Sequence, residues 1–193
     1  MPILSIPTDF ESRLAQFTAF VRPLGVNVNR TSGSAEAAVV IAEIAREIGV
    51  ADAVTSSELI VPAPGLIAAL ADLGVTCCVP QSVADAQDKS LGLSFATLAV
   101  AETGSVMLAE VTLADRSVGL LTIANVVVVR SSDMVPSLVE AASAMRDVSL
   151  RSNGSRYGSF VTGPSRTADI EMSLTVGVQG PARLFVIFVD KLS

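Results

Sequence analysis

The sequence predicts a single α/β domain with a Rossmann-like, largely parallel sheet flanked by helices. Three observations support this fold class. Helical periodicity alternates with short apolar strands along the chain. Half of the 193 residues are hydrophobic although aromatic residues make up only 4%, and a sheet covered on both faces produces such strands rich in Val, Ile and Leu. No apolar run in the sequence reaches the roughly 18 uninterrupted residues of a membrane span.

The first predicted element is an amphipathic helix that ends near Gly25. Thr8 and Glu11 have the spacing of a capping box at its start. The apolar residues that follow at helical spacing are Phe10, Leu14, Phe17 and Val21. We therefore expect residues 1–24 to form an N-terminal helical segment and residues 25–193 to form the α/β domain.

Helices and short strands are predicted to alternate over the next segment. Ser34 can cap a helix that Gly49 closes. Its expected buried stripe comprises Val39, Ile41, Ile44 and Ile48. The elements predicted after this helix are a strand at 52–55, a helix from Pro64 to Gly74, a strand at 74–79 and a helical turn at 84–88. The strand contains the adjacent residues Cys77 and Cys78, which we interpret as small strand residues that face opposite sides.

The second half begins with a predicted hairpin, or with a strand that breaks at a tight turn. Apolar segments at 94–100 and 105–111 flank the turn 101–104, where Gly104 can adopt positive φ. The elements predicted after it are a turn at 115–117, a strand at 126–129, a helix at 134–145 with Pro136 in its first turn, a strand at 159–162, a helix from about Ala168 and a strand at 184–189.

Composition excludes several classes of function. The chain has no histidine, which removes His-based acid–base catalysis and most zinc sites. Its net charge is −6 without a Lys/Arg cluster, so we expect neither a nucleic acid nor a membrane as partner. The start, Met1 to Pro7, is uncharged and broken by prolines, unlike a secretory signal. We expect a cytoplasmic protein.

The loop Gly163-Pro164-Ser165-Arg166-Thr167 is the first candidate site. Between a strand and a helix, its free N–H groups, hydroxyls and guanidinium would suit a carboxylate or phosphate. The alternative is structural: Ser165 or Thr167 caps the helix, and Asp169 complements the helix dipole. Asp169 also partly cancels the positive potential there. The residues alone leave both interpretations open.

The second candidate site is the turn Glu102-Thr103-Gly104. A carboxylate between two apolar segments can be desolvated, which raises its pKa and suits it to act as a nucleophile or general base. The alternative for Glu102 is a solvated turn residue. The residues favour this second interpretation.

Taken together, these motifs resemble the lactate-utilisation (LUD) domain family, and specifically its lactate-utilisation protein C branch. The resemblance covers roughly residues 90 to 190. The segments that carry it are Ala101–Ser105, Asn125–Val129, Thr162–Glu171, Gly177–Pro181 and Val189-Asp190. It implies a fold like that of the NagB, ribose-5-phosphate isomerase and CoA-transferase group. It also implies a component of bacterial L-lactate oxidation to pyruvate that works with iron–sulfur subunits. We expect no cofactor on this chain itself and any iron–sulfur cluster on a partner subunit.

The chain departs from the family at two positions. Asn125 and Gln179 lie in segments where family members usually carry histidine. If those histidines take part in chemistry, this chain has lost that chemistry or uses Asn125 and Gln179 only as hydrogen-bonding groups. Two other functions compete with lactate utilisation. The turn 101–104 resembles the Ser-Glu-Asn-Gly turn of CoA-transferases, which would make Glu102 the nucleophile of an acyl or CoA transferase. The second competing function is that of a non-catalytic ligand sensor.

Overall fold

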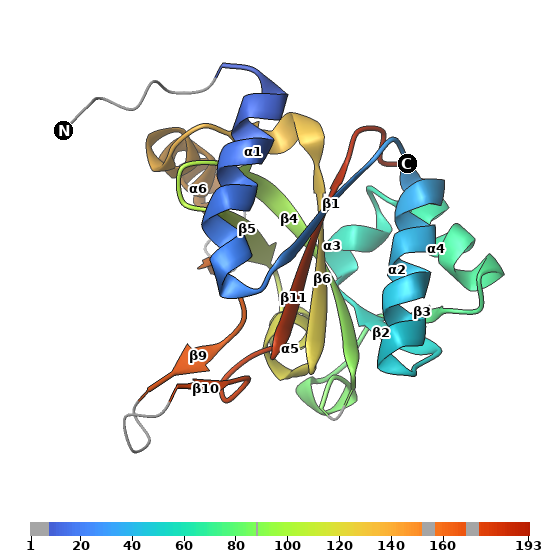
Figure 1. The fold of residues 1–193 in the computed structure, drawn as a ribbon. Helices are drawn as coiled ribbons and strands as arrows, with labels where there is room; N and C mark the ends of the chain where they lie inside the picture. The colour runs from blue at the N-terminus through green and yellow to red at the C-terminus, as the bar shows by residue number, and fades with distance from the viewer. Residues whose placement is uncertain (1–7, 88, 152–156, 169–173) are drawn as a thin grey trace.

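Six strands form the main sheet of the computed structural model, which describes residues 8–87, 89–151, 157–168 and 174–193. All neighbouring pairs among these six strands are parallel. Their spatial order is β1 (Asn27–Thr31), β11 (Arg183–Val189), β6 (Ala124–Arg130), β4 (Leu91–Val100), β2 (Asp52–Thr55) and β3 (Thr76–Cys78). The predicted fold class, a largely parallel sheet flanked by helices, is confirmed (Figure 1).

Alternate residues of the central strands feed two apolar cores, one on each face of the sheet. Val126 and Val128 pack into the first core, which α2 (Ser34–Ile48), α3 (Ser57–Ile60) and α4 (Pro64–Asp72) cover. Val127 and Val129 pack into the second core with α1 (Phe10–Val21). The run of valines is therefore buried on both sides, as a parallel sheet requires.

A smaller antiparallel extension grows from β4. After Phe95, β4 leaves β6 and pairs with β5 (Ser105–Glu110), with an irregularity in this second pairing between Ala96 and Leu98. The other elements of this part are β7 (Met134–Val135) beside β4, β8 (Tyr157–Val161) beside β5, and α6 (Leu138–Arg151). Two short strands, β9 (Arg166–Thr167) and β10 (Thr175–Val176), pair separately and project from the body (Figure 1).

The N-terminal helix packs directly on the second core. Phe17 and Val21 are almost fully buried, and the ring of Phe17 meets the ring of Phe188 edge-on at 5.3 Å. A 3₁₀ turn, η1 (Arg22–Leu24), and Gly25 at φ 78° lead from α1 into β1. This helix thus shares a core with the sheet.

Several local predictions were wrong. Asp9 caps α1 instead of Thr8, since its carboxylate accepts from the Ser12 amide at 2.9 Å. Gly33 is the N-cap of α2, and Val39 is exposed. The turn expected at 115–117 lies inside a helix, α5 (Leu113–Leu121).

The reason for the last error is local. The Thr112 hydroxyl accepts from the Asp115 amide at 3.0 Å, and donates to the Asp115 carboxylate at 2.7 Å. This reciprocal pair starts a helix where Asp-Arg-Ser suggests a turn. The helix expected at 134–145 starts later, at Leu138, because Met134–Val135 pairs with β4 as a strand.

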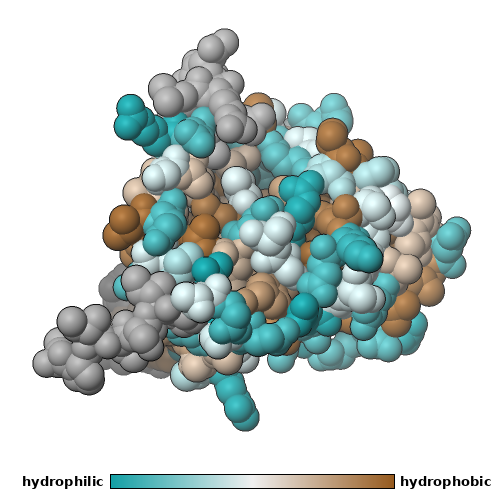
Figure 2. All heavy atoms as spheres, turned by 90° about the horizontal axis from the view of Figure 1, so that it is seen from above, coloured by the Kyte–Doolittle hydropathy of each residue, from teal (hydrophilic) through white to brown (hydrophobic). Residues whose placement is uncertain are grey.

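None of the helices within the described ranges is both long and apolar enough to span a bilayer. The carboxyl ends of the six parallel strands form one edge of the main sheet. Figure 2 looks down on this side of the molecule and shows a mixed surface, where hydrophilic residues surround small, separate hydrophobic areas. Ligands of parallel α/β sheets generally bind along this edge.

Candidate functional site

The turn 101–104 forms a hairpin between β4 and β5, as predicted. Gly104 has φ 63°, and a Cβ at this position would lie 2.6 Å from Val21 Cγ1 of α1. Glu102 is exposed, and its carboxylate accepts the Leu138 amide at 3.1 Å. The Glu102 carboxylate therefore satisfies a free N–H group in the first turn of α6.

The loop 163–167 is held by the loop 177–181. Ser165 makes three bonds to this second loop: its amide donates to Pro181 O at 3.0 Å, its carbonyl accepts from the Gly177 amide at 2.9 Å, and its hydroxyl accepts from the Gln179 amide at 3.1 Å. Gly163, at φ 80°, packs against Leu24. The structure thus brings the predicted residues Gly163, Ser165 and Gln179 together.

Arg166 and Thr167 lie in β9, where their partners in β10 are Val176 and Thr175. Their backbone is extended, so they do not form the first turn of a helix. Asp169 and most of the helix expected from Ala168 lie outside the described residues. The Arg166 guanidinium donates to Leu24 O at 2.5 Å.

The two candidate loops touch each other through hydroxyl groups. Thr103 Oγ1 donates to Ser105 Oγ at 2.8 Å, and Ser105 Oγ lies 2.5 Å from Thr162 Oγ1. The charged groups diverge, however: the Glu102 carboxylate turns to α6, and the Arg166 guanidinium turns to the end of α1. In Figure 1 the β4–β5 turn lies beside α6, whereas β9 and β10 project from the body of the domain. A pocket shared by Glu102 and Arg166 stays a prediction.

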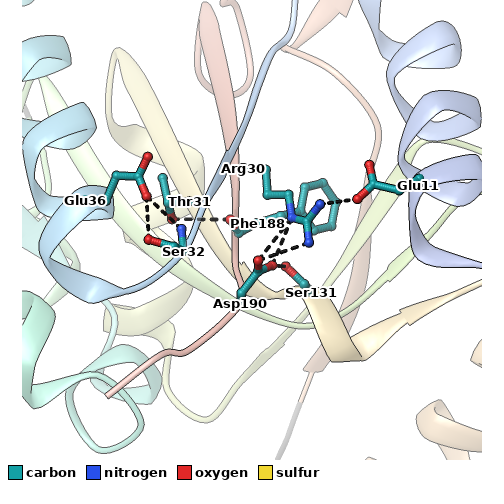
Figure 3. Close-up of polar contacts among 8 residues, drawn as sticks. All are labelled: Glu11, Arg30, Thr31, Ser32, Glu36, Ser131, Phe188 and Asp190. Carbon is teal, nitrogen blue, oxygen red and sulfur yellow. Dashed lines mark hydrogen bonds and ion pairs between the residues drawn. The ribbon is translucent and has the colours of Figure 1, made fainter.

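A polar network lies at the carboxyl ends of β1 and β11 (Figure 3). Arg30 binds Asp190 through Nε at 3.0 Å and also pairs with Glu11 of α1. The Ser131 hydroxyl donates to Asp190 at 2.5 Å. Hydrogen bonds from Arg30 and then Ser131 lower the pKa of Asp190. Two carboxylates already neutralise this guanidinium, so the network ties α1 to the sheet edge and offers little attraction to an anion.

A hollow of about 470 Å³ opens at the carboxyl ends of β2 and β3. Three segments line it: Ser57 after β2, residues 79–83 after β3, and residues 112–115 at the start of α5. We refer to this site as the β2–β3 hollow. Its lining does not include Glu102 or Arg166. Its size is within the range of small-molecule sites.

Asp115 belongs to the lining of this hollow although it is only 2% exposed. Its carboxylate accepts the Ser57 amide at 2.8 Å and the Thr112 hydroxyl at 2.7 Å. Burial opposes ionisation, but the hydrogen bonds from Ser57 and Thr112 outweigh it and lower the pKa of Asp115. The hollow therefore contains a fixed negative charge.

Glu110 is a buried carboxyl that sequence reasoning missed. It ends β5 and is 7% exposed. Burial raises its pKa to about 7, against the opposing effect of Arg116 and with support from Glu58 and Asp115. Arg116 Nε lies 3.9 Å from Glu110 Oε2, and the guanidinium stacks on Tyr157 at 4.2 Å.

The sequence signal for Glu110 was its place at the end of an apolar strand. Because α5 was not recognised as a helix, nothing in the sequence indicated that it covers this carboxyl. Helix α5 packs closely over the Glu110 carboxyl, since a Cβ at Gly119 of this helix would lie 3.7 Å from Glu110 Oε1.

The two cysteines do not fit an iron–sulfur cluster. They are adjacent in β3, with Cys77 partly buried and Cys78 exposed, and the chain has no others. Such clusters take four ligands, usually thiolates. Among the described residues, no group of three or more Cys, Asp or Glu could hold a metal ion.

Comparison with known families decides what this domain is. The family model described as LUD domain matches residues 14–189, which is most of the chain. The chain belongs to the LUD domain family. The match includes both candidate loops, the β2–β3 hollow and Glu110, so all these features are parts of the LUD domain.

The curated relatives of this LUD domain include two from Bacillus species. Lactate utilization protein C 1 of Bacillus mycoides is 40% identical over 106 residues, which cover 54% of this chain and 45% of that protein. Lactate utilization protein C of Bacillus subtilis is 35% identical over 113 residues, or 57% of this chain and 46% of that protein. The match thus spans a little less than half the length of these relatives.

A solved structure resembles the LUD domain over nearly its full length. It is the crystal structure of a DUF162 family protein from Deinococcus radiodurans, with a TM-score of 0.70 and 25% sequence identity. The match covers 95% of this chain and 99% of that one. It supports the arrangement of sheet and helices described above.

Proposed function

We propose that this LUD domain is a component of a bacterial L-lactate utilisation system, in which lactate is oxidised to pyruvate, and that it binds a partner oxidoreductase subunit or a small anionic ligand. The observation that carries the proposal is the similarity to proteins named lactate utilization protein C, at 35–40% identity over more than half of this chain.

The electron transfer of such a system would belong to iron–sulfur partner subunits. This chain has two adjacent cysteines and no histidine, so it cannot supply the four usual ligands of a cluster. Its own contribution would then be binding, through polar side chains and backbone groups.

The proposed binding surface consists of the two candidate loops beside the end of α1. Its residues are Thr103, Gly104, Gly163, Ser165, Arg166, Thr167 and Gln179, with Asp169 outside the described part of the chain. The contacts of Ser165 with the loop 177–181 and of Ser105 with Thr162 support a continuous surface. Arg166 is exposed and bonds the Leu24 carbonyl, so its guanidinium would be the cation that attracts a carboxylate.

A genetic test addresses the role in lactate utilisation. The chain is expressed in a Bacillus subtilis strain that lacks its own lactate utilization protein C, and growth on L-lactate is measured. We expect restored growth, and we expect the tagged chain to capture oxidoreductase subunits from lactate-grown cells. Failure of both readouts for a folded chain would count against the role.

A binding test addresses the surface. Thermal unfolding is followed with L-lactate, pyruvate, CoA and sugar phosphates, because a ligand that binds the folded state raises the midpoint. We expect Arg166→Ala to abolish a shift caused by a carboxylate. Arg183→Ala is the matched control, since Arg183 is a partly exposed arginine that pairs with Glu47 instead. Equal loss in both variants would remove Arg166 from the site.

The acyl-transferase alternative depends on Glu102 as a nucleophile. The contact of its carboxylate with the start of α6 favours a capping role instead. Incubation with acyl-CoA followed by hydroxylamine would modify Glu102 in a transferase. Recovery of the unmodified peptide by mass spectrometry would remove this alternative and leave a component or a ligand sensor.

A further inference from the structure

The β2–β3 hollow lies where a parallel α/β sheet usually binds its ligand. Residues 57 and 79–83 directly follow the carboxyl ends of β2 and β3, and residues 112–115 begin the helix α5. Its volume of about 470 Å³ can hold a small molecule. It is separate from the loops of the proposed function, so it raises an independent question.

One wall of the hollow is apolar. Val79, Pro80, Val83 and Leu113 contribute to the lining. Val83 is 44% exposed and Leu113 is 63% exposed, so both side chains have apolar surface that a ligand can cover. Covering them with a flat apolar ring would remove this area from water, which favours binding.

The rest of the lining can bind hydroxyl groups. Ser57 and Thr112 carry hydroxyls, and Asp115 supplies a buried carboxylate whose two oxygens each accept one bond. Each of those oxygens keeps a lone pair for a second donor. The amides of Leu113 and Ala114 are the first two of α5, and such groups have no acceptor within their helix.

The charge of the hollow selects against an anion. Asp115 is ionised and is the one charged residue in the lining among the described residues. Lactate, pyruvate and phosphates would meet this carboxylate without a compensating guanidinium or ammonium group. A neutral hydroxyl group can both donate to Asp115 and accept from the helix amides.

The neighbouring hydroxyl of Ser56 also lacks a partner. Ser56 is 3% exposed, and its Oγ makes no hydrogen bond to any described residue. It lies at the end of β2, next to Ser57 of the lining. A buried hydroxyl without a partner is costly, so this strand end has unused capacity for hydrogen bonding.

We propose that the β2–β3 hollow binds the ribonucleoside part of a ligand. The base packs against Val79, Pro80, Val83 and Leu113, with the Gln81 carboxamide near its polar edge. The ribose diol donates to Asp115 and accepts from the first amides of α5. This arrangement uses the apolar wall, the carboxylate and the helix terminus at the same time.

The test titrates the intact chain with adenosine and follows amide resonances by NMR. We expect shifts of the amides at 79–83 and 112–115, and binding about tenfold weaker for 2′,3′-dideoxyadenosine, which corresponds to the loss of about 1.4 kcal/mol. AMP should bind more weakly than adenosine because its phosphate meets the negative hollow.

Two variants complete the test without disturbing the cap of α5. Leu113→Ser removes an exposed wall residue and should weaken adenosine binding several-fold. Leu120→Ser is the matched control, because Leu120 is also exposed on α5 but does not line the hollow. Absence of binding at millimolar adenosine would overturn the proposal. So would equal affinity for the dideoxy compound, tighter binding of AMP, or equal effects of the two variants.

Discussion

Glu110 should make the stability of this domain depend on pH near neutrality. Burial moves its pKa from the ordinary value of 4.5 to about 7 in the folded chain. The groups that face it are Arg116 and Asp115 of α5, Glu58 of α3 and Tyr157 of β8. Arg116 favours the ionised form, but its Nε is 3.9 Å away, too far for a hydrogen bond.

The sign follows from proton binding in the two states. Below about pH 4.5 the carboxyl is protonated in both folded and unfolded chains, so it does not penalise folding. Between about 4.5 and 7 the unfolded chain loses the proton while the folded chain keeps it, so the free energy of unfolding falls as pH rises. Each pKa unit corresponds to about 1.4 kcal/mol, and a change from 4.5 to about 7 therefore amounts to about 3 kcal/mol.

The perturbation is Glu110→Gln, which keeps the shape and removes the charge. Urea unfolding at pH 5, 6, 7 and 8 gives the free energy of unfolding of both proteins. Between pH 5 and 8 the free energy of unfolding of the variant should rise relative to that of the wild type by about 2.5 kcal/mol, because part of the effect is already present at pH 5. The chain has no histidine, so few other side chains titrate in this window.

Glu43→Gln is the matched control, because Glu43 is an exposed carboxylate on α2. Its difference from wild type should stay constant across the four pH values. A constant difference for Glu110→Gln as well would refute the reasoning, since it would mean that burial does not hold the proton on Glu110.

Three further predictions concern other parts of the fold. Gly104→Ala should lower the free energy of unfolding, measured by urea titration, by more than about 1 kcal/mol. Gly74→Ala should cost less, because both glycines have positive φ but only Gly104 has α1 within 4 Å of the new Cβ. Equal losses would contradict that steric argument. Glu102→Ala should lower the free energy of unfolding by about 1 kcal/mol, because the contact with the start of α6 is lost. Glu102→Gln keeps an acceptor and should lower it by less. If urea unfolding shows that Glu102→Gln is the more destabilising variant, the capping role is rejected. Ellman's reagent should modify the exposed Cys78 before Cys77, because burial raises the pKa of the Cys77 thiol. If peptide mapping shows that Cys77 loses its free thiol first, β3 must open in solution.

The fold class was predictable because the strongest signals are local. The valines at 126–129 form a strand buried on both faces, Pro64 begins α4, and Gly49 ends α2 at φ 84°. Strand 52–55 was also predicted with the bounds that the structure has. In each case a single stretch of sequence determines the conformation, so periodicity and cap residues suffice.

The candidate site was less predictable because it depends on distant partners. Arg166 was expected before a helix, but its segment pairs as β9 with Thr175–Val176, and only long-range pairing determines that outcome. Asp115 was predicted to lie in a turn, but its bonds to Thr112 and Ser57 hold it in the first turn of α5. Glu110 gained its unusual environment from α5, which packs over it only in the folded chain.

Strand β4 contributes side chains to three apolar clusters of the domain. Its first half contributes Leu91 and Leu93 to the core under α2, and its second half contributes Ala96 and Ala99 to the core under α1. Leu98 points into a third cluster, beneath α6. Since one continuous strand anchors all three, the domain should open as a single cooperative unit, and the amides of β4 should be among the last to exchange with deuterated water.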